Sequence, residues 1–395
     1  MRVAMFMGAA ALAAPAMGQS IDIRPEVGAE LRVFPQEPRD PDQIETAQGS
    51  LILTGSARWR SDDRSTQVEV EPYLRLDSGD EERTYGDLRE ASLSWRGDRT
   101  DVTFGVSQVF WGVAESHNPV DVINQIDTLE DVDGDEKLGQ PMIRLSYQSD
   151  VGTVEAYYLP YFRTRGFPGE DGRFRTDPRV EDDKPRFERE DEEIAGDAAL
   201  RYTNRFGDFD LGAHVFYGTS RDPALVFDRD AGVLRPVYPE LAQGGLDVQF
   251  TRGPWLLKAE GVAGEVSGEA FYAGVAGFEY TVFDIGGNGL DLGLIGEYLG
   301  DSRDGKNGAP RAIFDNDVFV GARVTLNDIS DTEFLAGAIV DHETGAVQAS
   351  AEVQRRLGDF TLLELEGRIF DGSGDPLVEP IDRDDSLTVR LTRFF

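Results

Sequence analysis

Apolar and polar residues alternate with a period of two along most of this chain, and few stretches show the 3.6-residue period of a helix. The segment 318–326 is typical, because Val318 and Val320 fall on one side while Phe319 and Arg323 fall on the other. Successive side chains of a β-strand point to opposite faces of the sheet. The pattern therefore predicts an all-β chain whose strands have one apolar face and one mixed face.

Short turns rich in Gly, Asn and Asp join these alternating segments in pairs, as in β-hairpins. The expected hairpins are 50–60 with 66–76, 88–95 with 100–110, 142–148 with 153–162, 198–204 with 208–217, 245–250 with 255–263, 271–283 with 290–299, 318–326 with 332–341, and 347–356 with 360–370. A first strand near 27–34 and a last strand over 386–395 bring the expected number to about eighteen strands, with about sixteen as the alternative.

The connections between the hairpins are longer and more charged than the turns within them. They cover residues 35–48, 111–138, 163–193, 219–237, 300–311 and 371–384. This asymmetry is typical of a transmembrane antiparallel β-barrel with short periplasmic turns and long extracellular loops. A soluble β-sandwich would show the same alternation. The strand number, the aromatic residues near strand ends and the final strand ending at Phe395 favour the membrane barrel.

The first residues resemble a secretory signal, with Arg2, an apolar run over 3–14 and small residues up to Gly18. We predict a signal peptide at residues 1–18 and a barrel over residues 19–395, located in the outer membrane of a Gram-negative bacterium. The expected partners are outer-membrane lipids and lipopolysaccharide, the barrel assembly machinery, and small hydrophilic solutes. The oligomeric state is left open by the sequence.

The formal net charge is −35, from 74 acidic and 39 basic residues, which argues against nucleic acid as a partner. Cysteine is absent, so disulfides and thiol chemistry are excluded. We expect no cofactor, apart from a weak candidate Ca²⁺ site at Asp131, Asp133 and Asp135. Their spacing begins like an EF-hand loop. However, Glu136 and Met142 stand where an EF-hand needs Gly and Glu, so an acidic turn is the simpler interpretation.

Charges of both signs fall on the mixed faces of the predicted strands. A charge facing lipid would cost roughly 2–4 kcal/mol near the membrane midplane, so these faces are expected to line the lumen. The candidate lumen-facing charges are Glu69, Glu71, Arg75, Arg144, Arg201, Glu260, Glu297, Arg323, Glu366 and Arg390. A barrel of about eighteen strands is too wide to be filled by side chains, which predicts an aqueous channel. The alternative is a lumen closed by Arg–carboxylate pairs and loops.

The most distinctive stretch is 109–127, which leaves a predicted strand near Trp111 and is unusually apolar for a surface loop. Its apolar residues need cover, so we expect the loop to fold into the barrel and narrow the pore. The candidate constriction residues are Glu115, Asn118, Asp121, Asn124 and Asp127. In the alternative interpretation, the loop covers the barrel from outside.

Four segments within residues 84–175 carry a family resemblance: TYGDLREASLSW, FWGVAESHNPVDVINQID, DVDGDEKLGQPMIRLSY and YYLPYFRTRGFPGEDGRFR. They are similar to a largely uncharacterised family of proteobacterial outer-membrane porin-like β-barrels. The resemblance implies an outer-membrane barrel and brings neither a substrate nor catalytic residues.

These observations predict a porin-like channel for passive diffusion of small hydrophilic solutes, with a mild cation preference because acidic residues prevail in the lumen. A non-conducting structural or export barrel is the alternative, and an outer-membrane hydrolase is a third hypothesis. A membrane phospholipase, for example, would need a Ser–His pair. Ser116 and His117 are adjacent in an extended segment, where neighbouring side chains point apart, so we expect no enzyme.

Overall fold

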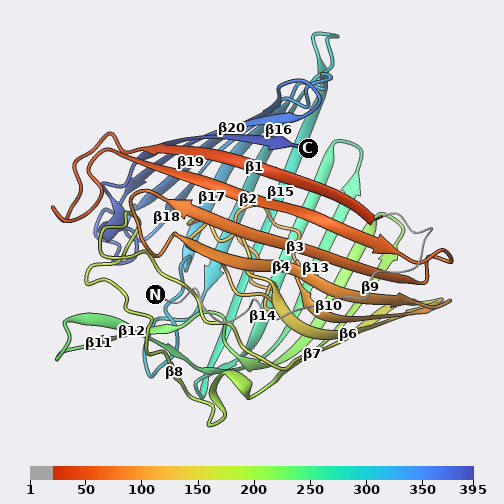
Figure 1. The fold of residues 1–395 in the computed structure, drawn as a ribbon, viewed down its shortest axis with the longest axis horizontal. Coiled ribbons are helices and arrows are strands. Elements are labelled where there is room, and N and C mark those ends of the chain that lie inside the picture. The colour runs from red at the N-terminus through yellow and green to blue at the C-terminus, as the bar shows by residue number, and fades with distance from the viewer. Residues whose placement is uncertain (1–20) are drawn as a thin grey trace.

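The computed structural model describes residues 21–395 and shows a closed antiparallel barrel of eighteen strands (Figure 1). The barrel strands are β1 (Ile21–Val33), β2 (Ala47–Arg60), β3 (Thr66–Asp77), β4 (Tyr85–Arg96), β5 (Thr100–Ser107), β6 (Gln140–Ser149), β7 (Gly152–Leu159), β9 (Asp197–Phe206), β10 (Phe209–Thr219), β13 (Glu240–Arg252), β14 (Trp255–Val266), β15 (Glu269–Ile285), β16 (Leu290–Asp301), β17 (Asn316–Thr325), β18 (Glu333–Asp341), β19 (Val347–Arg356), β20 (Thr361–Asp371) and β21 (Ser386–Phe394). Pairing of β21 with β1 closes the barrel. The predicted all-β barrel of about eighteen strands is confirmed.

The first strand differs from the prediction, because β1 runs from Ile21 to Val33 rather than over 27–34. The long strand β2 pairs with this extension, beginning with Ile21 opposite Trp59, so backbone hydrogen bonds prolong the strand beyond the alternating segment. The predicted signal peptide at residues 1–18 lies outside the described residues. Within residues 21–395, no helix is long and apolar enough to cross a membrane.

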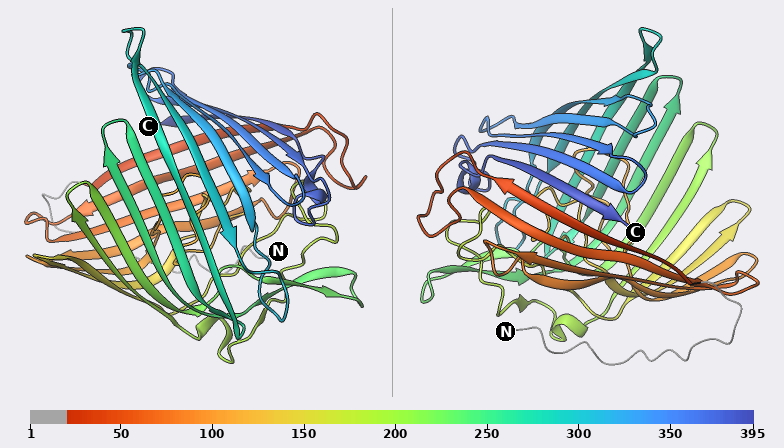
Figure 2. Two further views of the ribbon diagram at one scale, coloured as in Figure 1. Left: turned by 180° about the vertical axis from the view of Figure 1, so that it is seen from behind. Right: turned by 45° about the horizontal axis from the view of Figure 1, so that its top comes forward.

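The barrel has a turn rim, where short turns join the predicted hairpins, and a loop rim at the opposite end (Figure 2). The longest loop-rim connections are residues 108–139, between β5 and β6, and residues 160–196, between β7 and β9. Strands β8 (Arg186–Phe187), β11 (Ala224–Asp228) and β12 (Val233–Tyr238) form a separate small sheet within the long connections. Two short 3-10 turns, η1 (Glu192–Ile194) and η2 (Glu379–Ile381), also belong to them.

The two faces of the barrel wall differ as the alternation predicted. In β17, Val318 and Val320 are 40% and 55% exposed on the outside, whereas Phe319 between them is 8% exposed on the inside. The outer face is apolar along many strands, which is the surface that a transmembrane barrel presents to lipid. The inner face carries the charges and meets the loop described below.

Candidate functional site: the lumenal loop and the pore

Residues 108–139 fold into the barrel, and we call them the lumenal loop. Trp111 packs against Tyr157 of β7 and His214 of β10, with ring centroids 5.5 Å and 5.0 Å away. Val120 and Ile123 are completely buried in the same apolar cluster, which side chains from β6, β7, β9, β10 and β13–β15 complete. Burial against the inner wall removes these side chains from water. The structure thus places the loop inside the barrel, as its apolar residues predicted.

The first half of the lumenal loop reaches the opposite wall. Glu115 accepts a hydrogen bond from Arg323 of β17, at 2.6 Å, and lies 3.4 Å from Nζ of Lys258 on β14. β17 is the ninth strand after β5 in a barrel of eighteen, so it stands diametrically opposite the start of the loop. Backbone N–H groups of residues 113–116 also bind Glu260 of β14 and Glu297 of β16. The loop therefore divides the lumen.

The second half of the loop follows a row of lumenal arginines, which we call the arginine wall. Its members are Arg32, Arg75, Arg83, Arg89, Arg368 and Arg390. Arg89 of β4 binds Asp127 at 2.6 Å and Glu130 at 2.7 Å, and all three side chains are less than a tenth exposed. The carboxylate of Glu30, on β1, accepts hydrogen bonds from three other members of the wall, namely Arg75, Arg83 and Arg390. Each guanidinium has carboxylate partners, so this wall carries little uncompensated positive charge.

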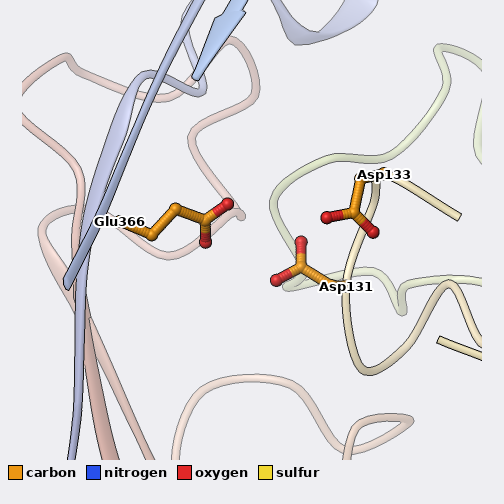
Figure 3. Close-up of side chains that lie close together, drawn as sticks. All are labelled: Asp131, Asp133 and Glu366. Carbon is orange, nitrogen blue, oxygen red and sulfur yellow. The ribbon is translucent and has the colours of Figure 1, made fainter. Parts of the chain in front are cut away.

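One acidic group on this side brings together Asp131 and Asp133 of the loop with Glu366 of β20, and Figure 3 shows their carboxylates facing one another. Arg368 binds all three, at 3.2 Å to Asp131 and 2.6 Å to Asp133. Burial alone would raise the pKa of Asp131, but the nearby guanidiniums of Arg368 and Arg32 lower this pKa to about 2. The guanidinium of Arg368 offsets part of the negative charge of this group. Glu366, rather than the predicted Asp135, is the third member of the group.

Two adjoining cavities lie between the lumenal loop and the barrel wall, the loop-side one lined by strands β13–β15 and β17–β20 and the turn-side one by strands β17–β21. The loop-side cavity has a volume of about 290 Å³ and reaches Arg303 and Phe314 at the loop rim. The turn-side cavity has a volume of about 310 Å³ and reaches Glu333 and Glu364, near the turn rim. Glu352 of β19 lines both, so the two cavities adjoin at this strand.

The turn-side cavity is strongly acidic. Eight carboxylates line it, against three guanidiniums, which belong to Arg323, Arg368 and Arg390. All three guanidiniums already bind carboxylates. In the part of the chain that the structure describes, four of the lining carboxylates make no ion pair. These four, which we call the free carboxylates, are Asp135, Glu136, Glu352 and Glu364.

The structure places all ten predicted lumen-facing charges on inward-facing strand positions. Four of the five candidate constriction residues line the loop-side cavity: Glu115, Asn118, Asp121 and Asn124. Asp127 does not, because it turns toward Arg89 and Tyr85 on the arginine wall. Ser116 and His117 do not pair: the Ser116 hydroxyl donates to Glu297 at 2.6 Å, and the His117 ring packs against Phe314.

Sequence reasoning missed Arg89 because a β-bulge shifts the alternation in β4. Glu71 pairs with Glu90 and Pro72 pairs with Leu88, which leaves Arg89 as the extra residue. Both Arg89 and Glu90 therefore contact lumenal groups. Pro72 was the available signal, since a proline inside a strand cannot donate to the ladder and often marks a bulge.

No protein-family model matches the chain, and no curated protein matches its sequence. Solved outer-membrane barrels do match its fold. A BenF-like porin from Pseudomonas fluorescens Pf-5 has a TM-score of 0.55 and 11% identity over 95% of this chain and 98% of the porin. OccAB1 of Acinetobacter baumannii has a TM-score of 0.54 and 8% identity, over 95% and 96% of the two chains.

A third match is Wzi of Escherichia coli, an outer-membrane protein involved in group 1 capsule assembly and a carbohydrate-binding β-barrel. Its TM-score is 0.54, with 10% identity over 94% of this chain and 84% of Wzi. At these identities the likeness concerns the fold, which is that of outer-membrane β-barrels of the porin type. The resemblance to one proteobacterial family stays a prediction.

Proposed function

We propose that this protein is a narrow porin-like channel of the Gram-negative outer membrane, through which small hydrophilic solutes diffuse with a mild cation preference. The observation that carries the proposal is the pair of adjoining cavities beside the lumenal loop, of which one reaches the loop rim and the other reaches Glu333 near the turn rim. The lumenal loop and the arginine wall occupy much of the remaining interior. Such a restricted path suits small solutes.

The cation preference rests on the free carboxylates, of which Glu136, with a pKa raised to about 8 by its burial, carries its charge only at alkaline pH. Fixed negative charges in a confined lumen with low-dielectric walls raise the local concentration of cations. The arginines of the same cavity do not oppose this effect, because each is bound to carboxylates. Acidic residues therefore dominate the field in the turn-side cavity, whereas six acidic and five basic side chains line the loop-side cavity.

The experiment is a planar-bilayer measurement of the refolded full-length protein, with reversal potentials in a KCl gradient. We expect cations to be favoured modestly, and the preference to shrink at high salt as screening increases. Glu352→Gln with Glu364→Gln should weaken the preference. Glu265→Gln on the outer face of β14 removes one carboxylate charge outside the lumen and should leave selectivity unchanged, whereas either lumenal substitution alone should already weaken it. Anion selectivity of the native protein would contradict the proposal.

The dense ion pairing between the lumenal loop and the arginine wall favours one alternative, a structural or export barrel that does not conduct. In that case the ion pairs would fix a rigid interior that hosts a polysaccharide, lipid or partner protein. A correctly folded protein that inserts into bilayers but shows no conductance would support this alternative.

A further inference from the structure

Two buried glutamates of the barrel wall bind the segment 113–118 of the lumenal loop. Oε1 of Glu260, on β14, accepts hydrogen bonds from the N–H of Val113 at 2.5 Å, the N–H of Ala114 at 2.8 Å and Nδ2 of Asn118 at 2.8 Å. Glu260 is only 5% exposed. Three donors of the loop therefore converge on one carboxylate oxygen.

Glu297, on β16, binds the next part of the segment. Its Oε1 accepts from the N–H of Glu115 at 2.8 Å, and its Oε2 accepts from the N–H and the hydroxyl of Ser116 at 2.8 Å and 2.6 Å. Glu297 is 3% exposed. The two glutamates thus satisfy four consecutive backbone N–H groups in a segment that has no regular secondary structure.

We infer that Glu260 and Glu297 are positioning residues that hold the segment 113–118 across the lumen and so set the width of the pore. Hydrogen bonds to a charged, buried acceptor are among the stronger ones in proteins, and a backbone segment without ladder bonds depends on them. Glu115 alone, through Arg323 and Lys258, would hold the same segment only by side-chain contacts. The inference deepens the proposed channel function and rests on it.

The two glutamates should respond differently to conversion into glutamine. Among the described residues, Oε2 of Glu260 has no hydrogen-bond partner, so Glu260→Gln can keep its carbonyl oxygen where Oε1 now lies. Glu297 uses both oxygens, so Glu297→Gln must direct its NH₂ group at a loop donor. We therefore expect Glu297→Gln to release the segment more than Glu260→Gln does, although both remove one charge.

The test combines amide hydrogen exchange with conductance on the same refolded, full-length preparations. Exchange of a peptide that contains residues 113–116 should accelerate about tenfold in Glu297→Gln, which is the effect of losing charge-assisted hydrogen bonds, and less in Glu260→Gln. Glu71→Gln is the matched control, because it removes a lumen-facing charge on β3 that has no contact with the segment. Faster exchange should accompany larger single-channel conductance.

The outcomes separate the inference from the proposed function. Faster exchange in Glu297→Gln with no conductance in any variant would support the positioning role and refute the channel. Unchanged exchange and conductance in a folded Glu260→Ala/Glu297→Ala double variant, while the native protein conducts, would refute the positioning role. Equal changes in Glu71→Gln and Glu297→Gln would show that charge alone is responsible, and would also refute it.

Discussion

Arg89 of β4 binds the lumenal loop at three points. Its Nη2 donates to Asp127 at 2.6 Å and to Glu130 at 2.7 Å, and its Nη1 donates to the carbonyl of Lys137 at 2.6 Å. The guanidinium also lies 4.4 Å from the ring centre of Tyr73. Arg89→Ala would remove all of these contacts at once.

The size of the expected loss of stability in Arg89→Ala follows from the burial of Arg89 and its partners. Arg89, Asp127 and Glu130 have side chains that are 6%, 3% and 8% exposed. Removal of one member of a buried ion pair leaves an uncompensated charge and costs about 3–5 kcal/mol. Loss of the contact with Tyr73 adds about 0.5–2 kcal/mol. Water entering the lumen offsets part of this, so we expect Arg89→Ala to lower the free energy of unfolding by about 3–5 kcal/mol.

The assay is urea unfolding of the barrel in lipid vesicles, followed by the fluorescence of its four tryptophans. Arg96→Ala is the matched control, because Arg96 ends the same strand and pairs with Asp101 at 3.4 Å with exposures of 76% and 44%. Exposed pairs contribute about 0–1 kcal/mol. Equal losses of less than about 1 kcal/mol in both variants would refute the view that the loop is fixed by buried ion pairs.

Two further predictions concern permeation. Replacement of residues 113–137 by a short Gly/Ser link removes eight acidic residues and one lysine, which together carry a net charge of −7, and leaves the arginine wall facing the pore. Conductance should therefore rise, and reversal potentials should shift toward anion selectivity. An unchanged selectivity would show that other groups screen the charge of the arginine wall. Burial in the barrel and the neighbouring Glu130 raise the pKa of Glu136 to about 8. Because of this raised pKa, Glu136 binds a proton and loses its charge as the pH falls through 8. Cation selectivity should therefore decrease between pH 9 and pH 7. A selectivity that does not change over this range would show that Glu136 does not face the conducting path.

The sequence by itself determined the wall of this protein. Alternation with a period of two and turns rich in Gly, Asn and Asp are local signals, and they predicted the hairpins, the strand number and the inward position of residues such as Arg323 and Glu297. The apolar content of the lumenal loop predicted that it folds inward, because Val120 and Ile123 could not be left in water.

Only the tertiary structure decided how the interior is divided. Arg390 meets Glu30 across 360 residues of sequence, and Glu115 meets Arg323 across 208, because closure of the barrel brings distant strands together. The bulge at Arg89 changed which face that residue occupies. The sequence does not distinguish a carboxylate that binds an arginine from a carboxylate that faces a cavity. Asp127 and Glu352 therefore differ in their partners only because loop and strand positions in three dimensions supply a guanidinium to one and open space to the other.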